Sequence, residues 1–194
     1  MALRANGIEV AGMVGRTPER VEEVTRELGI PRGSVDWEEM LEAVEPDLVA
    51  IGTPGGWRRA PILEAIKRGC HVFCDKPLEV TADRARELRD AAQAEGVRTA
   101  YAASFRYQPY CREAARQVAA GKIGVPWEVE CITHYDLDPL IPFHWSHRVA
   151  QGGGRLSNHF THKLSIVEAV LGCRMTAVMG EVRNDMKRAP RGGR

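Results

Sequence analysis

The feature that most constrains the fold is a regular alternation of short apolar runs with helical segments in roughly the first 100 residues. Apolar runs at 8–14, 47–51, 71–74 and 97–102 alternate with helix signals at 19–28, 37–44, 57–68 and 81–95. Glycine follows three of these helical segments, at Gly29, Gly69 and Gly96, which is typical of helix C-caps. Strands that alternate with helices build parallel sheets, so this part is predicted to be an α/β domain.

The pattern changes near Phe105. A helix is predicted at 109–120, a partly alternating strand at 127–135, a loop rich in Pro and His at 137–150, a helix at 157–171 and a strand at 175–182. Alternation is typical of an open antiparallel sheet. The sequence therefore predicts two domains, 1–104 and 105–183, followed by a disordered basic tail at 184–194.

Composition excludes several classes of protein. The 27 Lys and Arg balance 26 Asp and Glu, which gives no electrostatic case for nucleic acid or an acidic membrane surface. No apolar run approaches the ~18 residues of a membrane span, and the N-terminus lacks the layout of a signal peptide. Five scattered cysteines without a CxxC pair predict reduced thiols in a cytoplasmic protein.

Unusual residues follow three of the predicted strands. They are Gly15-Arg16-Thr17, the segment 52–56 (GTPGG) and Asp75-Lys76-Pro77. Each alone is most simply an ordinary turn, but ligands of parallel sheets bind beyond the carboxyl ends of the strands, so together they favour a site. A lysine fixed at a strand end, such as Lys76, can hydrogen-bond a substrate oxygen and stabilise negative charge on it, and Asp75 could orient it. The alternative is a surface ion pair of little energetic value.

The stretch 65–78, AIKRGCHVFCDKPL, closely resembles the segment around the EKP motif of the Gfo/Idh/MocA oxidoreductases. Segments 47–54, 104–109, 121–126, 152–154 and 158–162 agree with that family in order and spacing. The resemblance covers about residues 8–182. It implies a partial Rossmann-like parallel sheet followed by an incomplete α+β substrate domain with an open sheet.

The resemblance also implies a function, an NAD(P)-dependent transfer of hydride to or from a sugar-like or polyol carbon. By position, Lys76 matches the lysine that aligns substrate and cofactor, and His162 matches the general acid/base. Histidine suits that role because its ordinary pKa lies near neutrality. The positions that match dinucleotide contacts are Thr53, Pro54, Asp75, Lys76 and Arg106.

The predicted helix at 157–171 has two faces. Phe160, Leu164, Val167 and Leu171 form an apolar stripe, and Asn158, His162 and Ser165 lie on the opposite face. From the helix alone, the polar face is best interpreted as solvated. The Gly152-Gly153-Gly154 triplet and the family resemblance instead favour a catalytic role for His162 and Asn158.

Several features depart from the family pattern. The first strand and its G-x-G-x-x-G loop, which holds the pyrophosphate, are not found in this sequence, and the family is longer at its C-terminus. We therefore expect a fragment with impaired cofactor binding. Asn158 stands where relatives usually have Asp, and Arg58 where many have His. Arg16, next to Thr17 after the second family strand, favours NADP over NAD, because arginine accommodates a 2′-phosphate.

Two other interpretations remain open. A non-catalytic partner or regulatory module could retain this fold without binding a cofactor. The five histidines at 134, 144, 147, 159 and 162 could instead form a zinc site, although no cysteine or carboxylate stands at ligand spacing in the two H-x-x-H pairs. No nucleic-acid or membrane partner is expected. A homo-oligomer could form through the C-terminal sheet of a full-length parent.

Overall fold

A computed structural model describes residues 2–134, 141–183, 188 and 190. The chain divides into two compact units. The first comprises Met1–Ile51, Ala60–Phe73 and Leu88–Thr99, and the second comprises Gly52–Arg59, Cys74–Glu87 and Ala100–Arg194. The tail predicted at 184–194 lies outside the described residues, apart from 188 and 190.

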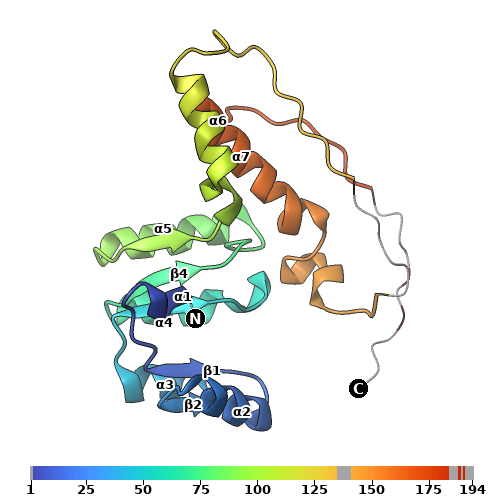
Figure 1. Ribbon diagram of the computed structural model, residues 1–194. Coiled ribbons are helices and arrows are strands. Elements are labelled where there is room, and N and C mark those ends of the chain that lie inside the picture. The colour runs from blue at the N-terminus through green and yellow to red at the C-terminus, as the bar shows by residue number, and fades with distance from the viewer. Residues whose placement is uncertain (1, 135–140, 184–187, 189, 191–194) are drawn as a thin grey trace. The chain divides into compact units, whose positions relative to one another are not determined.

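The first unit contains a two-stranded parallel sheet. Strand β1 (Gly12–Val14) pairs with β2 (Arg32–Ser34) so that Met13 lies opposite Gly33. The connection between them is helix α2 (Pro18–Leu28), which begins with Pro18 and ends at Gly29 in the left-handed conformation. A proline at the helix start and a glycine just past its end are the residues that these two positions favour. Helices α1 (Ala2–Ala5) and α3 (Trp37–Val44) also belong to this unit (Figure 1).

Two glycines let the helices approach this small sheet closely. A Cβ atom on Gly33 would lie 2.5 Å from Val21 Cγ1 of α2, and one on Gly12 would lie 2.5 Å from Met40 Sδ of α3. Neighbouring positions on paired strands alternate between the faces of a sheet. Helices α2 and α3 therefore cover opposite faces of the β1–β2 pair.

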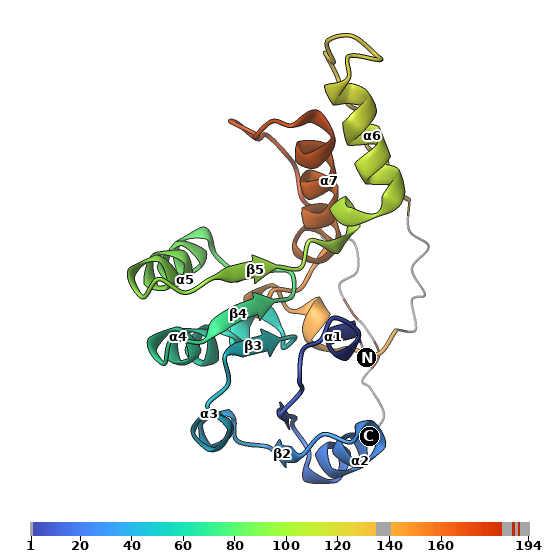
Figure 2. The same ribbon diagram turned by 60° about the vertical axis from the view of Figure 1, so that its left-hand side comes forward.

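The other three strands form a second sheet in the order β3–β4–β5, namely β3 (Leu48–Ile51), β4 (His71–Cys74) and β5 (Thr99–Tyr101) (Figure 2). Helix α4 (Arg59–Lys67) connects the first two, and α5 (Ala82–Ala94) connects the last two. Apolar side chains from α4, β4 and α5 are almost completely buried: Ile62, Ala65, Ile66, Val72, Leu88 and Ala92. This burial, more than intrinsic propensity, keeps such short strands and helices in place.

The second unit is mainly helical beyond β5. The 3₁₀ turn η2 (Ser104–Tyr107) leads into helix α6 (Pro109–Ala119), which packs against α7 (Thr161–Leu171) (Figures 1 and 2). Short turns lead into α7: η3 (Trp145–His147), η4 (Val149–Gln151) and the π-helical turn η5 (Leu156–Phe160). A further 3₁₀ turn, η1 (Gly55–Trp57), follows β3.

The α/β class with parallel sheets is confirmed, and most elements fall where the sequence predicts them. Strand β2 was not predicted, because Arg32-Gly33-Ser34 has none of the apolar, β-branched character of a strand. The helix predicted at 57–68 is a 3₁₀ turn followed by α4. The helix predicted at 157–171 begins instead with the π-helical turn.

Two predicted strands are wrong for the residues that the structure describes. Segments 127–134 and 175–182 contain no strand, and the rest of the first prediction, at 135, lies outside the described residues. A strand exists only when its N–H and C=O groups pair with a neighbour. In the described part of the chain, the only hydrogen bond recorded for these segments joins Met175 N to the Glu168 carboxylate. Alternation in sequence predicts a strand but cannot supply the partner strand that it needs.

None of the helices found in the described residues is long and apolar enough to cross a membrane.

Candidate functional site

The loops that follow β3 and β4 lie in the second unit and carry Thr53, Pro54, Asp75 and Lys76. The Asp75 side chain folds back so that its Oδ1 accepts a hydrogen bond from Lys76 N at 2.8 Å. The Lys76–Pro77 peptide bond is cis. The loop after β4 is therefore held in a defined turn at the end of the strand.

Lys76 contacts Asn158, which is 82 residues further along the chain. Its Nζ donates to Asn158 Oδ1 at 3.4 Å. The Asn158 amide nitrogen donates to the carbonyls of Gly152 and Gly154, at 3.2 and 3.3 Å. Because these two acceptors hold the nitrogen, the oxygen is presented to the lysine. The glycine triplet thus orients Asn158, and Asn158 contacts Lys76 without neutralising its charge.

His162 lies four residues beyond Asn158 and is 6% exposed. Its ring stacks on Phe105, with centroids 4.2 Å apart and planes inclined by 16°. Burial lowers the pKa of His162 below its ordinary value; Lys76 and Lys163 lower it further, and Asp75 opposes them. The imidazole is therefore neutral near pH 7 and able to accept a proton.

The Nδ1 atom of His162 is buried and has no hydrogen-bond partner in the described part of the structure. A buried polar atom without a partner is costly and is uncommon away from functional sites. The site thus contains a neutral imidazole with an unsatisfied nitrogen, and the charge of Lys76 contributes to its lowered pKa.

The solvated-face interpretation of this helix is wrong. Asn158 and His162 are buried, whereas Phe160 of the predicted apolar stripe is 42% exposed. A π-helical turn at Leu156–Phe160 precedes α7, and such a turn changes the angular spacing of residues relative to an α-helix. Single π turns of this kind occur frequently at functional sites.

Three further residues were predicted to bind the cofactor, namely Arg106, Arg16 and Thr17. Arg106 lies in η2, and its guanidinium lies over the Tyr107 ring at 5.7 Å. Arg16 and Thr17 belong to the first unit and are exposed between β1 and α2. Thr17 is the N-cap residue of α2 but makes no side-chain capping bond. The structure thus joins Lys76 to Asn158 directly, and among the described residues of the second unit it shows no contact of Arg106 with them.

The histidine-rich segment has other interactions. His144 and His147 form a capping box around η3, and His159 Nε2 lies 2.8 Å from Arg155 Nη1. Within the described residues, no group of three or more His, Cys, Asp or Glu side chains is placed to hold a metal ion. The zinc hypothesis thus has no ligand set in this part of the chain.

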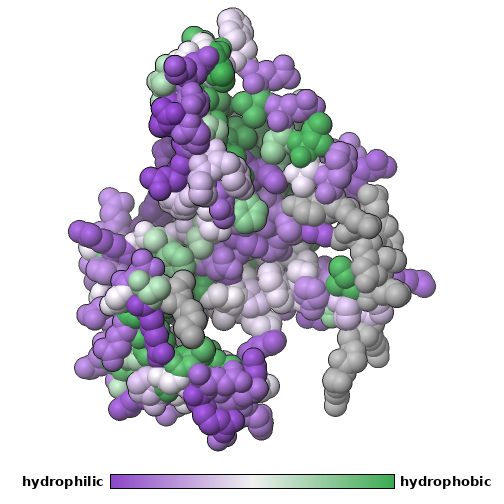
Figure 3. Space-filling model, viewed as in Figure 1, coloured by the Kyte–Doolittle hydropathy of each residue, from purple (hydrophilic) through white to green (hydrophobic). Residues whose placement is uncertain are grey.

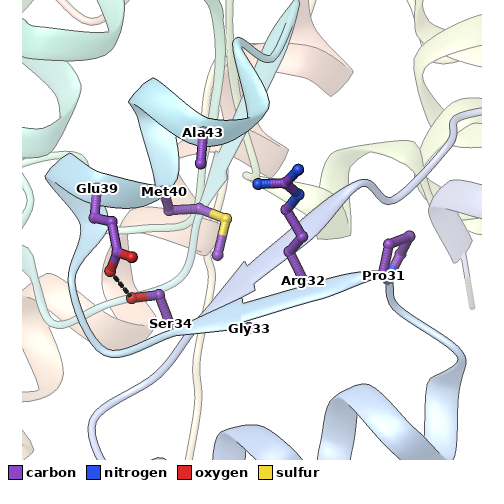
Figure 4. Close-up of a pocket in the computed structure, with 7 residues that line it drawn as sticks. All are labelled: Pro31, Arg32, Gly33, Ser34, Glu39, Met40 and Ala43. Atoms are coloured by element: carbon purple, nitrogen blue, oxygen red, sulfur yellow. Dashed lines mark hydrogen bonds between the residues drawn. The ribbon is translucent and has the colours of Figure 1, made fainter.

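A separate pocket of about 300 Å³ lies in the first unit between β2 and α3 (Figure 4). Its lining includes Arg32, Ser34, Glu39 and Met40. Ser34 Oγ donates to the Glu39 carboxylate at 2.8 Å, so these two polar groups already satisfy each other. No predicted site residue lines this pocket. It was not anticipated because strand β2 was not predicted.

Two residues of the Lys76–Asn158–His162 site were not predicted in their observed roles. Phe105 was recognised only as a domain boundary, and Arg58 only as a departure from relatives. Arg58 is 1% exposed and binds the loop carbonyls that flank Lys76. Nothing in the linear pattern distinguishes Arg58 from the exposed Arg59 beside it.

Comparison with known proteins identifies relatives over most of the chain. Residues 1–103 match a family model described as an oxidoreductase family with an NAD-binding Rossmann fold, and residues 111–191 match the GFO/IDH/MocA C-terminal domain. The chain is 30% identical to a scyllo-inositol 2-dehydrogenase (NAD(+)) of Bacillus subtilis over 84% of its length and 46% of the relative's. It is 31% identical to a 1,5-anhydro-D-fructose reductase of Ensifer adhaerens over 88% and 51%. The chain therefore spans about half the length of the curated relatives it matches.

Solved structures agree on the fold. An oxidoreductase domain protein from Kribbella flavida superposes with a TM-score of 0.84 at 28% identity, covering 95% of this chain and 51% of that one. A levoglucosan dehydrogenase in complex with NADH and levoglucosan superposes with a TM-score of 0.73 at 22% identity, covering 84% and 45%.

Proposed function

Because the chain belongs to the Gfo/Idh/MocA oxidoreductase family, we propose that it serves NAD(P)-dependent hydride transfer to or from a sugar or polyol carbon. The observation that carries the proposal is the association of Lys76, Asn158 and His162 in one unit. Two of the relatives act, by name, on an inositol and on an anhydro sugar, which supports this substrate class.

The residues present suit the reactive end of a dinucleotide. Thr53, Lys76 and Arg106 supply hydroxyl and cationic donors, and the unpartnered Nδ1 of His162 leaves a polar atom to be satisfied. The sequence has no G-x-G-x-x-G motif to hold a pyrophosphate. We therefore propose that the chain binds dinucleotide weakly.

The nicotinamide ring, when bound, accepts or donates the hydride. His162 takes the hydroxyl proton of the substrate during oxidation, because its lowered pKa keeps it neutral, with a ring nitrogen free to accept a proton. The Lys76 ammonium donates a hydrogen bond to the same oxygen and stabilises the negative charge that develops there. Asn158 accepts a hydrogen bond from Lys76 but carries no charge and cannot take the proton itself.

The proposal extends to the cofactor type. Relatives include both an NAD(+) enzyme and an NADP(+) enzyme, so the family does not determine the preference. Arg16 is exposed two residues after β1, where a cation can bind a 2′-phosphate. We propose a preference for NADP.

The test is to measure NAD(P)H formation with a panel of inositols, aldoses and anhydro sugars. Lys76→Met and His162→Gln should each lower the rate about a hundredfold or more, the scale of lost acid–base catalysis. The rate of substrate oxidation should persist below the pH at which an ordinary histidine becomes protonated, since the pKa of His162 is lowered.

Lys67→Met is a matched control, because it removes an exposed ammonium that pairs with the Glu64 carboxylate on the surface. It should leave the rate unchanged. A folded wild-type chain that binds neither dinucleotide would contradict the proposal and favour a non-catalytic module.

A further inference from the structure

Arg58 is the most deeply buried charged residue in the described part of the chain, with 1% of its surface exposed. It follows η1 and precedes α4, and Arg59 directly after it lies at the surface. Burying a guanidinium is costly unless its donors are satisfied. Its retention inside the second unit therefore requires a set of compensating contacts.

Those contacts are backbone carbonyls from two loops. Arg58 Nε donates to Thr53 O at 2.8 Å, and Nη2 donates to the same oxygen. Nη1 donates to the carbonyls of Asp75 and Pro77 and lies 3.4 Å from Cys74 Sγ. The ion pairs found among the described residues do not include Arg58. Burial raises the pKa of the Cys74 thiol, so the thiol stays neutral and gives Arg58 no negative charge to pair with.

The two carbonyls on Nη1 belong to the residues on either side of Lys76. One guanidinium thus fixes the backbone before and after the lysine and ties both to the Thr53 loop. Among the described residues, the lysine side chain has one hydrogen bond, the 3.4 Å contact with Asn158, which is too long to hold it by itself. The direction of the Lys76 side chain therefore depends on its backbone anchor.

We propose that Arg58 is a positioning residue that acts through Lys76, fixing the 75–77 turn so that the ammonium is held beside Asn158. The consequence for catalysis rests on the function proposed above; the consequence for Lys76 itself does not. The planar, forked guanidinium spreads its donors in fixed directions and so reaches carbonyls on two loops at once. A lysine at position 58 would keep the charge and lose this geometry.

The test compares Arg58→Lys and Arg58→Met with the wild type, using two measurements. The first is the ¹⁵Nζ NMR signal of Lys76, assigned by its loss in Lys76→Arg. The second is NADPH affinity by fluorescence titration. In both variants the Lys76 signal should move to the position of the exposed lysines. NADPH should bind about tenfold more weakly, the loss expected for one hydrogen bond to a charged group.

Arg59→Met is the matched control. It removes a neighbouring guanidinium that pairs with the Glu87 carboxylate at the surface, and it should change neither measurement. In Arg58→Ala, millimolar guanidinium ion should restore the Lys76 signal, because it can refill the vacated donor site.

An unchanged Lys76 signal in a folded Arg58 variant would overturn the proposal. Cooperative unfolding of every Arg58 variant under native conditions would also overturn it, since the role would then be purely structural. If the wild type binds no NADPH while the Lys76 signal still responds to Arg58, the proposed function fails and the positioning role stands.

Discussion

At the scale of single residues, the side chain after β1 is expected to determine which dinucleotide binds. Arg16 is exposed, so its guanidinium is available to a 2′-phosphate. Arg16→Asp should weaken NADP binding about tenfold or more, since it replaces a charge-assisted contact by repulsion. Binding of NAD, which has a 2′-hydroxyl for the new carboxylate, should change little. Calorimetric titration of both dinucleotides checks this. Arg20→Asp, one turn into α2 and paired with Glu23, is the control. Equal weakening of NAD and NADP by Arg16→Asp would remove the argument.

At the scale of elements, helix α3 depends on its N-cap. Asp36 accepts hydrogen bonds from the backbone nitrogens of Glu38 and Glu39, at 2.8 and 3.3 Å. Asp36→Ala leaves these donors without that partner and should lower the free energy of unfolding by about 1 kcal/mol. Urea denaturation measures the loss. Asp36→Asn retains an acceptor oxygen and should cost much less. Identical losses in Asp36→Ala and Asp36→Asn would show that the cap contributes through charge rather than through its hydrogen bonds.

At the scale of the whole molecule, the second unit leaves large apolar side chains in solvent. Trp127 is 97% exposed, Met179 100% and Val125 80%. Figure 3 shows hydrophobic surface gathered near α6 and α7. Exposed apolar groups of this size favour association. We expect light scattering to show a mean mass that grows with protein concentration, and the double variant Trp127→Gln, Met179→Gln to reduce that growth. A wild-type chain that stays monomeric at every concentration would contradict this expectation.

Local signals were sufficient for much of the fold. The HVFC strand, the Pro18 helix start and the glycine C-caps are set by short-range sterics and burial pattern, and the structure has them where the sequence places them. Strand pairing could not be predicted from such local signals. Strand β2 has no apolar pattern and exists because β1 lies beside it, whereas 127–134 has the pattern of a strand and has no partner in the described residues.

The same division holds for the candidate site. The sequence by itself determined which chemical groups are present and how they are spaced. It places a lysine after a predicted strand and a histidine four residues beyond Asn158. Only the tertiary structure decided their environment. Asn158 and His162 are buried, His162 is stacked on Phe105, and Lys76 is anchored by Arg58. Charge and chemistry belong to individual residues, but desolvation and hydrogen-bond geometry depend on neighbours that are distant along the chain and are brought together only by folding.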